Sequence, residues 1–357
     1  MSAGPRVLFL ARGHGFGHAA RDLRIIRAMR ALRPDVEIQV MASGSAAVYL
    51  DLYGESCIDM GIGDHEDMTP AAGARVWALM DRHDPFDLVV ADEVVWSLVY
   101  CVKRWRRRAI LLTDWFYSEL GAPESDPILD QAGEILLLDF SVAHPGPFGV
   151  TNPIQAFGPV VEEFRVDREA ARAALGAAAS ETIVVLTIGG MTAMVDNTAI
   201  AELTVRTWLE HAPPGHRLFV LAEPFCPVPD DRAADVVWAG FTAEPEKYYA
   251  AADLVVANAN GTVIGDLVWN RIPVLAMTHP AVTYPDSFGL RVKAMSEAGM
   301  TVHGEATVST SAQWQLMDEA KRNDCRPDPA FEWTTGEQVA RHLLARLDYM
   351  LAKSATG

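Results

Sequence analysis

The chain has 357 residues, more than one ordinary hydrophobic core supports, and this length indicates two domains of about 150 to 200 residues. Half of the residues are hydrophobic and 22% are charged, a balance that excludes an intrinsically disordered chain. The formal net charge of −17 argues against a nucleic-acid partner, because a surface that binds phosphate groups needs an excess of positive charge.

Other compositional features predict the location of the protein. The first residues lead directly into a strand, so we expect no signal peptide, and no apolar run approaches the ~20 residues of a membrane span. The cysteines lack the spacing of a metal site and indicate a reducing compartment: Cys57, Cys101, Cys226 and Cys325. We therefore expect a cytoplasmic protein.

Strand-like and helical segments alternate along the first half of the chain. Residues 6–11 form an apolar run, a glycine-rich turn follows, and 19–32 alternates apolar and basic residues at helical spacing. The next predicted strands lack polar alternation, as strands buried on both faces do: 36–41, 87–91, 109–113 and 134–138. Around 142–159, proline, glycine and asparagine interrupt the pattern and indicate a domain boundary.

The alternation then restarts, with an Ala-rich helix at 168–179 and another helix at 196–209. The strands predicted here are 182–187, 217–221, 236–238, 253–257 and 273–277. Residues 336–352 form an amphipathic final helix. This pattern predicts an α/β protein of two Rossmann-like, doubly wound parallel-sheet domains that face each other across a cleft. We place the domains at 1–157 and 158–335, with 336–357 packing back on the first.

The turn after the first strand is the most informative segment. Gly13, Gly15 and Gly17 allow backbone to approach a ligand closely, and His14 and His18 can exchange a proton near neutral pH. The turn therefore combines free backbone N–H groups with a titratable side chain. Under the alternative interpretation, the glycines only make the turn and the histidines only cap the helix.

Two nucleotide motifs are disfavoured or excluded. A dinucleotide fingerprint G-x-G-x-x-G needs a small residue at position 18, which is His18, and the second strand ends in Met41-Ala42-Ser43 without an acid for a ribose. No G-x-x-x-x-G-K-[ST] sequence occurs, so a P-loop is excluded.

The second half carries a matching set of motifs. A strand runs into Gly189-Gly190, and a helix N-terminus of this kind can seat a phosphate. Further on, Asn258-Ala-Asn260-Gly261-Thr262 leads to Asp266, and a strand opening at Pro273 is followed by His279 and by Asp286-Ser287.

With these motifs in order, the chain resembles the GT-B glycosyltransferases, most closely the branch typified by the lipid II N-acetylglucosaminyltransferase (MurG-like). The resemblance covers nearly the whole length and rests on Gly17-His18 after the first strand, Gly189-Gly190, and Asp266 seven positions before Pro273. The chain departs from the family where Asn260 replaces a glycine, Val263 a threonine and Ser287 a glutamine.

The resemblance implies an acceptor-binding first domain and a second domain that binds a nucleotide-sugar donor. Asp266 would hold the ribose, and Asp286 and Ser287 would contact the donor sugar. The remaining donor-binding candidates are His279 and the turn residues Gly15, Gly17, Gly189, Gly190, Asn260, Gly261 and Thr262. The alternative for each is a purely structural role.

The implied reaction is an inverting sugar transfer from a nucleotide diphosphate donor to a small-molecule or lipid-linked acceptor. No D-x-D sequence occurs, so we expect no metal and no cofactor besides the donor substrate. The expected base is His18, with His14 second. Asp114, like Asp92 and Glu93, follows a predicted strand and would orient the base or bind acceptor, or else act as a helix cap.

Other functions and surfaces stay open. A GT-B nucleotide-sugar hydrolase or epimerase would share the Gly-His loop, and a non-catalytic nucleotide-sugar binder is a third class. The basic run 103–108 indicates contact with an anionic acceptor or a peripheral membrane surface, or else a solvated helix face. Residues 115–117 indicate an aromatic acceptor platform or core packing. The biological setting would be natural-product or cell-envelope glycosylation.

Overall fold

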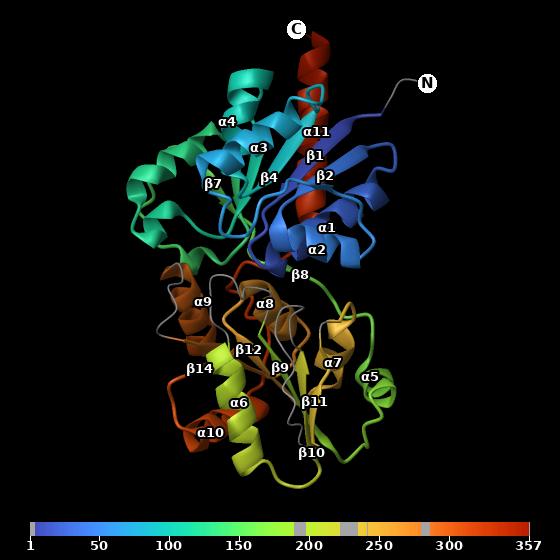
Figure 1. Cartoon of the computed structure of the whole chain (residues 1–357), viewed down its shortest axis with the longest axis vertical. Coiled ribbons are helices and arrows are strands. Elements are labelled where there is room, and N and C mark those ends of the chain that lie inside the picture. Colours follow the sequence, from blue (N-terminus) through green and yellow to red (C-terminus); the bar gives the residue numbers. More distant parts are fainter. Residues whose placement is uncertain (1–3, 189–197, 222–234, 241, 280–285, 357) are drawn as a thin grey trace. The chain divides into compact units, whose positions relative to one another are not determined.

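The computed structural model describes residues 4–188, 198–221, 235–240, 242–279 and 286–356. The chain divides into two compact units (Figure 1). Unit 1 comprises Met1–Val161 with Glu332–Gly357, and unit 2 comprises Glu162–Phe331. The positions expected for Gly189 and Gly190 lie outside the described residues.

The main sheet of unit 1 is parallel, with the strand order β3-β2-β1-β4-β5-β6-β7. In its centre, Phe9 pairs with Val40 on one side and with Val90 on the other. The strand bounds are β1 Arg6–Ala11, β2 Glu37–Ala42, β3 Ile58–Asp59, β4 Leu88–Asp92, β5 Ile110–Thr113, β6 Glu134–Leu137 and β7 Ile154–Ala156.

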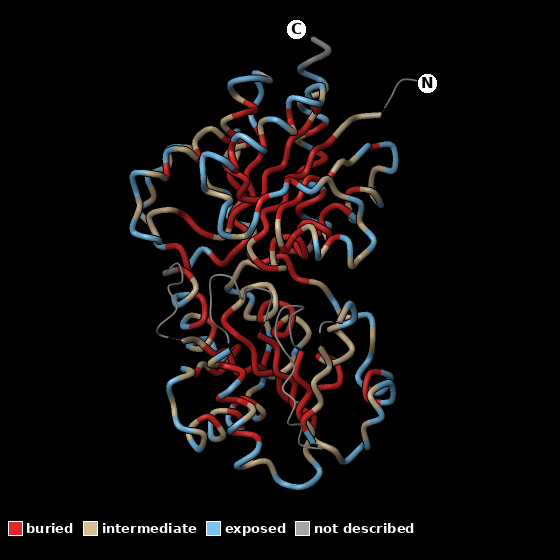
Figure 2. Tube along the Cα trace, viewed as in Figure 1, coloured by how far each residue is buried: buried red, intermediate tan, exposed pale blue. Residues whose placement is uncertain are grey.

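Both faces of this sheet are covered, which explains the uninterrupted apolar strands. Phe9 of β1 packs in a core with helices α1 (Phe16–Leu32), α2 (Gly44–Leu52) and α11 (Gly336–Thr356). Leu8, one residue earlier, points to the opposite core with α3 (Pro70–Met80) and α4 (Val95–Tyr100). Figure 2 shows the buried residues concentrated along the strands.

The final helix belongs to unit 1, although it follows unit 2 in the sequence. Val339, Leu343 and Leu347 of α11 are fully buried in the same core as α1. The chain returns through a short parallel pair in which β15 (Thr334–Thr335) lies beside β8 (Val160–Val161).

Unit 2 has a second parallel sheet, in the order β11-β10-β9-β12-β13-β14. Its strands are β9 Thr182–Thr187, β10 His216–Leu221, β11 Val236–Trp238, β12 Leu254–Asn258, β13 Val274–Thr278 and β14 Val302–Glu305. The helices are α5 Arg168–Ala174, α6 Thr198–His211, α7 Pro245–Ala251, α8 Gly261–Trp269, α9 Asp286–Glu297 and α10 Thr310–Arg322. The expected fold class of two doubly wound parallel-sheet domains is confirmed.

Each sheet has one point where the strand order reverses. In unit 1 the chain runs outward from β1 in one direction and then restarts at β4 in the other, and in unit 2 the same change occurs between β9 and β12. In open α/β sheets, ligands bind outside the carboxyl ends of the strands at this point. The fold therefore predicts which loops carry function.

Two predicted helix bounds were wrong. The Ala-rich helix expected at 168–179 ends at Ala174, because Gly176 has a left-handed φ of 61° and turns the chain away. The first helix begins at Phe16, so His18 lies inside its first turn instead of at its mouth. Among the described helices, none combines the length and apolarity needed to cross a bilayer.

Candidate functional site

The β1–α1 turn is tightly packed and needs its glycines. A Cβ at Gly13 would lie 2.1 Å from the carbonyl oxygen of Ser43, and Gly15, the N-cap of α1, has a φ of 79° that favours glycine. Gly17 lies in the first turn of α1 beside His18. The turn thereby directs His18 toward the end of β4, the neighbouring strand at the switch point.

His18 is held by a buried carboxylate. Its Nδ1 lies 2.8 Å from Oδ1 of Asp92, the last residue of β4. Arg21, one turn further along α1, donates Nε to Oδ2 of Asp92 at 2.7 Å and Nη2 to Oδ1 at 2.5 Å. Nη1 of the same guanidinium donates to Asp114 at 2.9 Å, which links the ends of β4 and β5. With Nδ1–H donating to Asp92, Nε2 of His18 keeps its lone pair.

Glu93 follows Asp92 in a strained backbone conformation. Its φ is 55°, an unusual value for a residue other than glycine. The buried carboxylate accepts Nη1 of Arg12 at 2.7 Å and the indole N–H of Trp115 at 2.5 Å. It also accepts the hydroxyl of Thr113 at 3.1 Å and the backbone N–H of Asp114 at 3.0 Å. These four donors hold the strained residue in place.

The surroundings shift the pKa values of the two central groups in opposite directions. Burial by itself lowers the pKa of the His18 imidazole, but the carboxylates of Asp92 and Glu93 outweigh burial, and the net direction is upward. Burial raises the pKa of the Asp92 carboxyl, but the charges of Arg21 and His18 bring it down to about 2. Asp92 is therefore an anion near neutral pH and stabilises a protonated His18.

His14 has a different environment. Burial and the nearby charge of Arg12 lower its pKa to about 3, and its Nδ1 lies 3.2 Å from the carbonyl oxygen of Asp64. An imidazole with so low a pKa is a weak base. Of the two histidines, His18 has the environment expected of a general base.

The same cluster has the spacing of a metal site, since ligand atoms of His18, Asp92 and Glu93 lie within 4.8 Å of one another. However, the guanidinium groups of Arg21 and Arg12 already bind these two carboxylates. A divalent cation here would lie beside two fixed positive charges, which is unfavourable. We therefore interpret the cluster as an ion-pair network.

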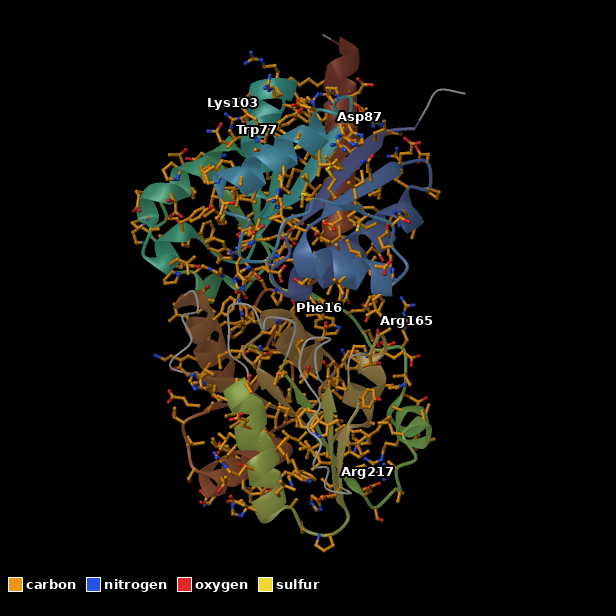
Figure 3. The ribbon with its side chains drawn as sticks, in the orientation of Figure 1. Phe16, Trp77, Asp87, Lys103, Arg165 and Arg217 are labelled. Carbon is orange, nitrogen blue, oxygen red and sulfur yellow. The ribbon has the colours of Figure 1, made fainter. Side chains whose placement is uncertain are left out.

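The two surface features noted in the sequence take ordinary positions in the structure. Phe116 is buried and stacks on Phe148 with ring centroids 3.9 Å apart, so it belongs to the core. Trp115 is also buried, but its indole N–H donates to Glu93. In the basic run, Lys103 and Arg104 are exposed, and Lys103 lies 6.0 Å from the ring centroid of Trp77 (Figure 3).

In unit 2, the predicted donor residues gather at the start of α8, beside the switch point. Asn260 is the N-cap of α8, and its Oδ1 accepts the backbone N–H of Thr262 at 3.0 Å. A Cβ at Gly261 would lie 2.8 Å from Nη1 of Arg291, so this glycine allows a buried guanidinium to approach the helix N-terminus. Sequence reasoning missed Arg291, which resembles any surface arginine of α9.

Asp266 lies in the second turn of α8 and is buried. Its Oδ1 accepts the backbone N–H of Glu162 at 3.0 Å, and Asn270, one turn later, accepts the N–H of Phe164 at 2.8 Å. Asp266 thus fixes the segment that enters unit 2, a structural role that the motif did not predict.

Asn258 is a second residue that sequence reasoning missed as a site candidate. It ends β12 at the switch point, is 4% exposed, and its Oδ1 has no hydrogen-bond partner among the described residues. Such an orphaned buried acceptor calls for a ligand or another explanation. The sequence offered one indication of this role, the position of Asn258 at the end of a predicted strand.

The remaining predicted donor residues follow β13. His279 is half-buried directly after this strand, and Ser287 is fully buried in the first turn of α9. The hydroxyl of Ser287 has no partner within the described part of the chain. Asp286 is the first residue of α9, and its side chain lies outside the description.

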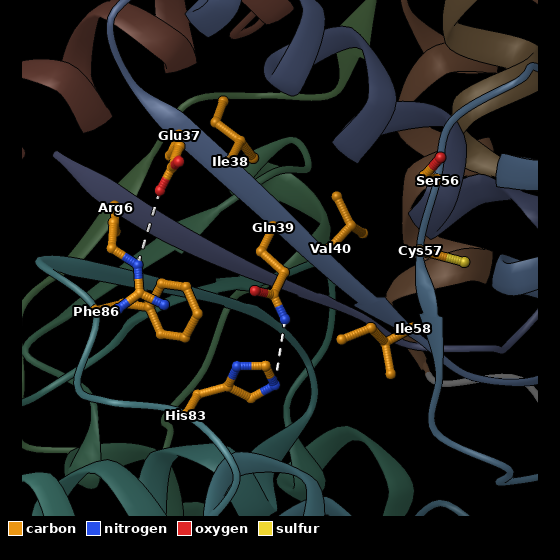
Figure 4. Close-up of a pocket in the computed structure, with 10 residues that line it drawn as sticks. All are labelled: Arg6, Glu37, Ile38, Gln39, Val40, Ser56, Cys57, Ile58, His83 and Phe86. Atoms are coloured by element: carbon orange, nitrogen blue, oxygen red, sulfur yellow. Dashed lines mark hydrogen bonds and ion pairs between the residues drawn. The ribbon is translucent and has the colours of Figure 1, made fainter. Parts of the chain in front are cut away.

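A separate cavity of about 530 Å³ opens at the amino ends of β1 and β2, opposite to the end where His18 lies (Figure 4). In its lining, Nε2 of Gln39 lies 3.3 Å from Nε2 of His83, and the guanidinium carbon of Arg6 lies 4.3 Å from the ring centroid of Phe86. These groups satisfy one another, so the cavity does not extend the His18 network.

No family model and no curated protein matches the chain. Solved structures do match. MurG from Acinetobacter baumannii gives a TM-score of 0.60 at 12% identity, over 96% of this chain and 99% of that one. Arabidopsis thaliana UGT89C1 in complex with UDP gives 0.64 at 11% identity, over 98% and 99%. A protein described as a UDP-N-acetylglucosamine 2-epimerase from Listeria monocytogenes gives 0.60 at 12% identity, over 98% of both chains. At these identities the likeness establishes the fold, which is that of the GT-B glycosyltransferases.

Proposed function

We propose that this protein is an inverting glycosyltransferase that moves a sugar from a nucleoside diphosphate donor to a hydroxyl of a small-molecule or lipid-linked acceptor. The single observation that carries the proposal is the buried His18–Asp92 pair, 2.8 Å apart, at the switch point of unit 1. The GT-B fold, shared with MurG and with UGT89C1 in complex with UDP, supports it.

In this proposal His18 is the general base. Asp92, itself held by Arg21, accepts the Nδ1–H of the imidazole, which leaves Nε2 to take the proton of the acceptor hydroxyl. The acceptor oxygen forms a bond to the anomeric carbon as the bond from that carbon to the diphosphate oxygen breaks. A single displacement of this kind inverts the anomeric centre, and the nucleoside diphosphate leaves with the negative charge.

Unit 2 would bind the donor. The start of α8 would stabilise a leaving diphosphate without a metal ion, since a helix N-terminus carries a partial positive charge even where, as at Thr262, the side chain of Asn260 caps an N–H group. Asn258, Thr262 and Ser287 offer polar atoms near this end of the sheet, and Asp266 would contact the ribose. His279 would approach the phosphates.

The test has two steps. Thermal-shift measurements with uridine, thymidine and guanosine diphosphates identify the nucleotide, because a ligand that binds the native state raises the unfolding temperature. Release of that diphosphate from its sugars is then measured with and without candidate acceptors. Release that depends on the acceptor supports the transferase; failure of every nucleotide to stabilise the protein contradicts it.

A nucleotide-sugar hydrolase or epimerase is the second candidate, favoured by the likeness to the Listeria protein. Diphosphate release at the same rate without any acceptor indicates hydrolysis, and a change in the sugar on the recovered nucleotide indicates epimerisation. A non-catalytic binder would bind nucleotide and release none.

A further inference from the structure

One buried acid in unit 1 is not used by the network described so far. Asp22 lies on α1, four residues after His18 and one after Arg21, so the three side chains share one face of the helix. Its exposed fraction is 0%, and within the described chain neither carboxyl oxygen has a hydrogen-bond donor.

The N–H groups of the nearby cationic side chains already donate to acceptors other than Asp22. Arg21 directs Nε and Nη2 to Asp92 and Nη1 to Asp114. His18 directs Nδ1 to Asp92 as well. Asp22 therefore has the charge of Arg21 nearby but no N–H from it, and an ionised carboxylate buried in this way would be strongly unfavourable.

The charged groups that act most strongly on the Asp22 carboxyl are Asp92 and Glu93 from the end of β4 and Arg21 from its own helix. Burial and the Asp92 charge raise the pKa of the Asp22 carboxyl well above its ordinary value, while that of Asp92 falls to about 2. Adjacent acids whose pKa values move apart share one proton, which resides on the acid with the higher value.

We propose that Asp22 is a neutral carboxylic acid whose O–H donates a hydrogen bond to Asp92 and so positions the Asp92–His18 pair. Asp92 then accepts from three side chains, and its single negative charge faces His18. Asp22 is a positioning residue that touches no reacting atom. Its role in catalysis rests on the proposed function, whereas its protonation state does not.

The deciding variant is Asp22→Asn, which keeps the shape and a donor group but cannot ionise. The titration of the His18 imidazole is followed by NMR in the full-length protein. If Asp22 is neutral, the His18 midpoint stays where it is. If Asp22 is ionised, the variant removes a nearby anion and lowers the midpoint by about 1 to 3 units. Asp92→Asn is the positive control that must lower it.

Infrared spectroscopy gives an independent reading, since a protonated carboxyl has a C=O band that a carboxylate lacks. We expect one such band near neutral pH, lost in Asp22→Asn. A lowered His18 midpoint in Asp22→Asn, or no band that the variant removes, overturns the proposal. Neither measurement requires turnover, so failure of the proposed function leaves the result interpretable.

If the protein is the proposed transferase, Asp22→Leu tests the positioning role, because leucine fills the space without a donor. We expect kcat to fall about 10- to 100-fold, the scale known for residues that orient a metal-bound histidine, with KM for the donor unchanged. Asp22→Asn should restore most of kcat. Equal losses in both variants would overturn the positioning role.

Discussion

Replacement of His18 by alanine gives the sharpest test of the proposed chemistry. The fold should tolerate it, because Asp92 keeps the two hydrogen bonds from Arg21 at 2.7 and 2.5 Å. Only the group proposed to receive the acceptor proton is lost. A positioned general base contributes about 10²- to 10⁴-fold to a rate, so kcat should fall by this factor. This corresponds to about 3 to 5 kcal/mol of transition-state stabilisation.

The assay is release of nucleoside diphosphate with saturating acceptor, together with the dissociation constant of the nucleotide. Nucleotide affinity should not change, since the proposed donor residues lie in unit 2. His14→Ala is the matched control: His14 comes from the same turn, but its pKa of about 3 makes it a poor base, so this variant should lose much less activity.

Two results would refute this reasoning. Near-full turnover in His18→Ala with loss of activity in His14→Ala would mean that the base is the other histidine of the turn. Full activity in both variants would mean that neither imidazole takes the proton, and Asp114, which is partly exposed beside Arg21, would be the next residue to replace.

Four further predictions follow from the same structure. In the wild type, turnover should fall on the acid side with a midpoint above 6.5, because the base works only when neutral and its surroundings raise the pKa of His18; a midpoint below 6.5 in the pH–rate profile contradicts this. Asn258→Leu should weaken nucleotide binding by about 1 to 2 kcal/mol in calorimetry, since it removes a buried polar group whose Oδ1 has no partner among the described residues. Asp266→Ala should weaken it by about 1 to 3 kcal/mol, and unchanged affinity with a lower melting temperature would assign Asp266 a purely structural role. His144 is buried between Glu119 and Asp139, and its hydrogen bonds to these carboxylates outweigh burial and raise its pKa to about 9. Its contribution to the free energy of unfolding, at most about 3 kcal/mol, is therefore complete below about pH 6.5 and is lost as the pH rises through 9. Chemical denaturation across this range should show the loss in the wild type, and His144→Gln should abolish this pH dependence.

Strands buried on both faces were the most predictable part of the fold. The bounds of β1 and β9 agree with the predicted ranges to the residue, because a short continuous run of Val, Leu and Ile favours a strand that is covered on both faces. The edge strands β7 and β14 were missed. Their sequences, Ile-Gln-Ala and Val-His-Gly-Glu, mix polar and apolar residues, and only pairing with a neighbour gives them strand geometry.

The candidate site was visible in the sequence only where local chemistry decides its residues. The glycine turn and His18 are visible in the sequence because backbone geometry requires glycine there and histidine titrates near neutral pH. Arg21 and Asp22 looked like the polar side of an ordinary helix. Their burial depends on β4, some 70 residues later in the chain, where Asp92 supplies the partner. The spacing of these residues from His18, three and four positions, was the available signal.

The two ends of the unit 1 sheet differ in ways that favour the carboxyl end as the candidate site. At the amino ends, a cavity of about 530 Å³ is lined by groups that satisfy one another, such as Gln39 and His83. At the carboxyl ends, a residue with a φ of 55° and a fully buried acid without a donor among the described residues both persist next to His18. Features of this kind reduce stability, and a fold retains them where the surrounding structure over-determines them, typically at active sites. The strain at Glu93 and the burial of Asp22 without a donor to its oxygens among the described residues therefore favour the carboxyl end of the sheet as the candidate site, as the sheet topology does.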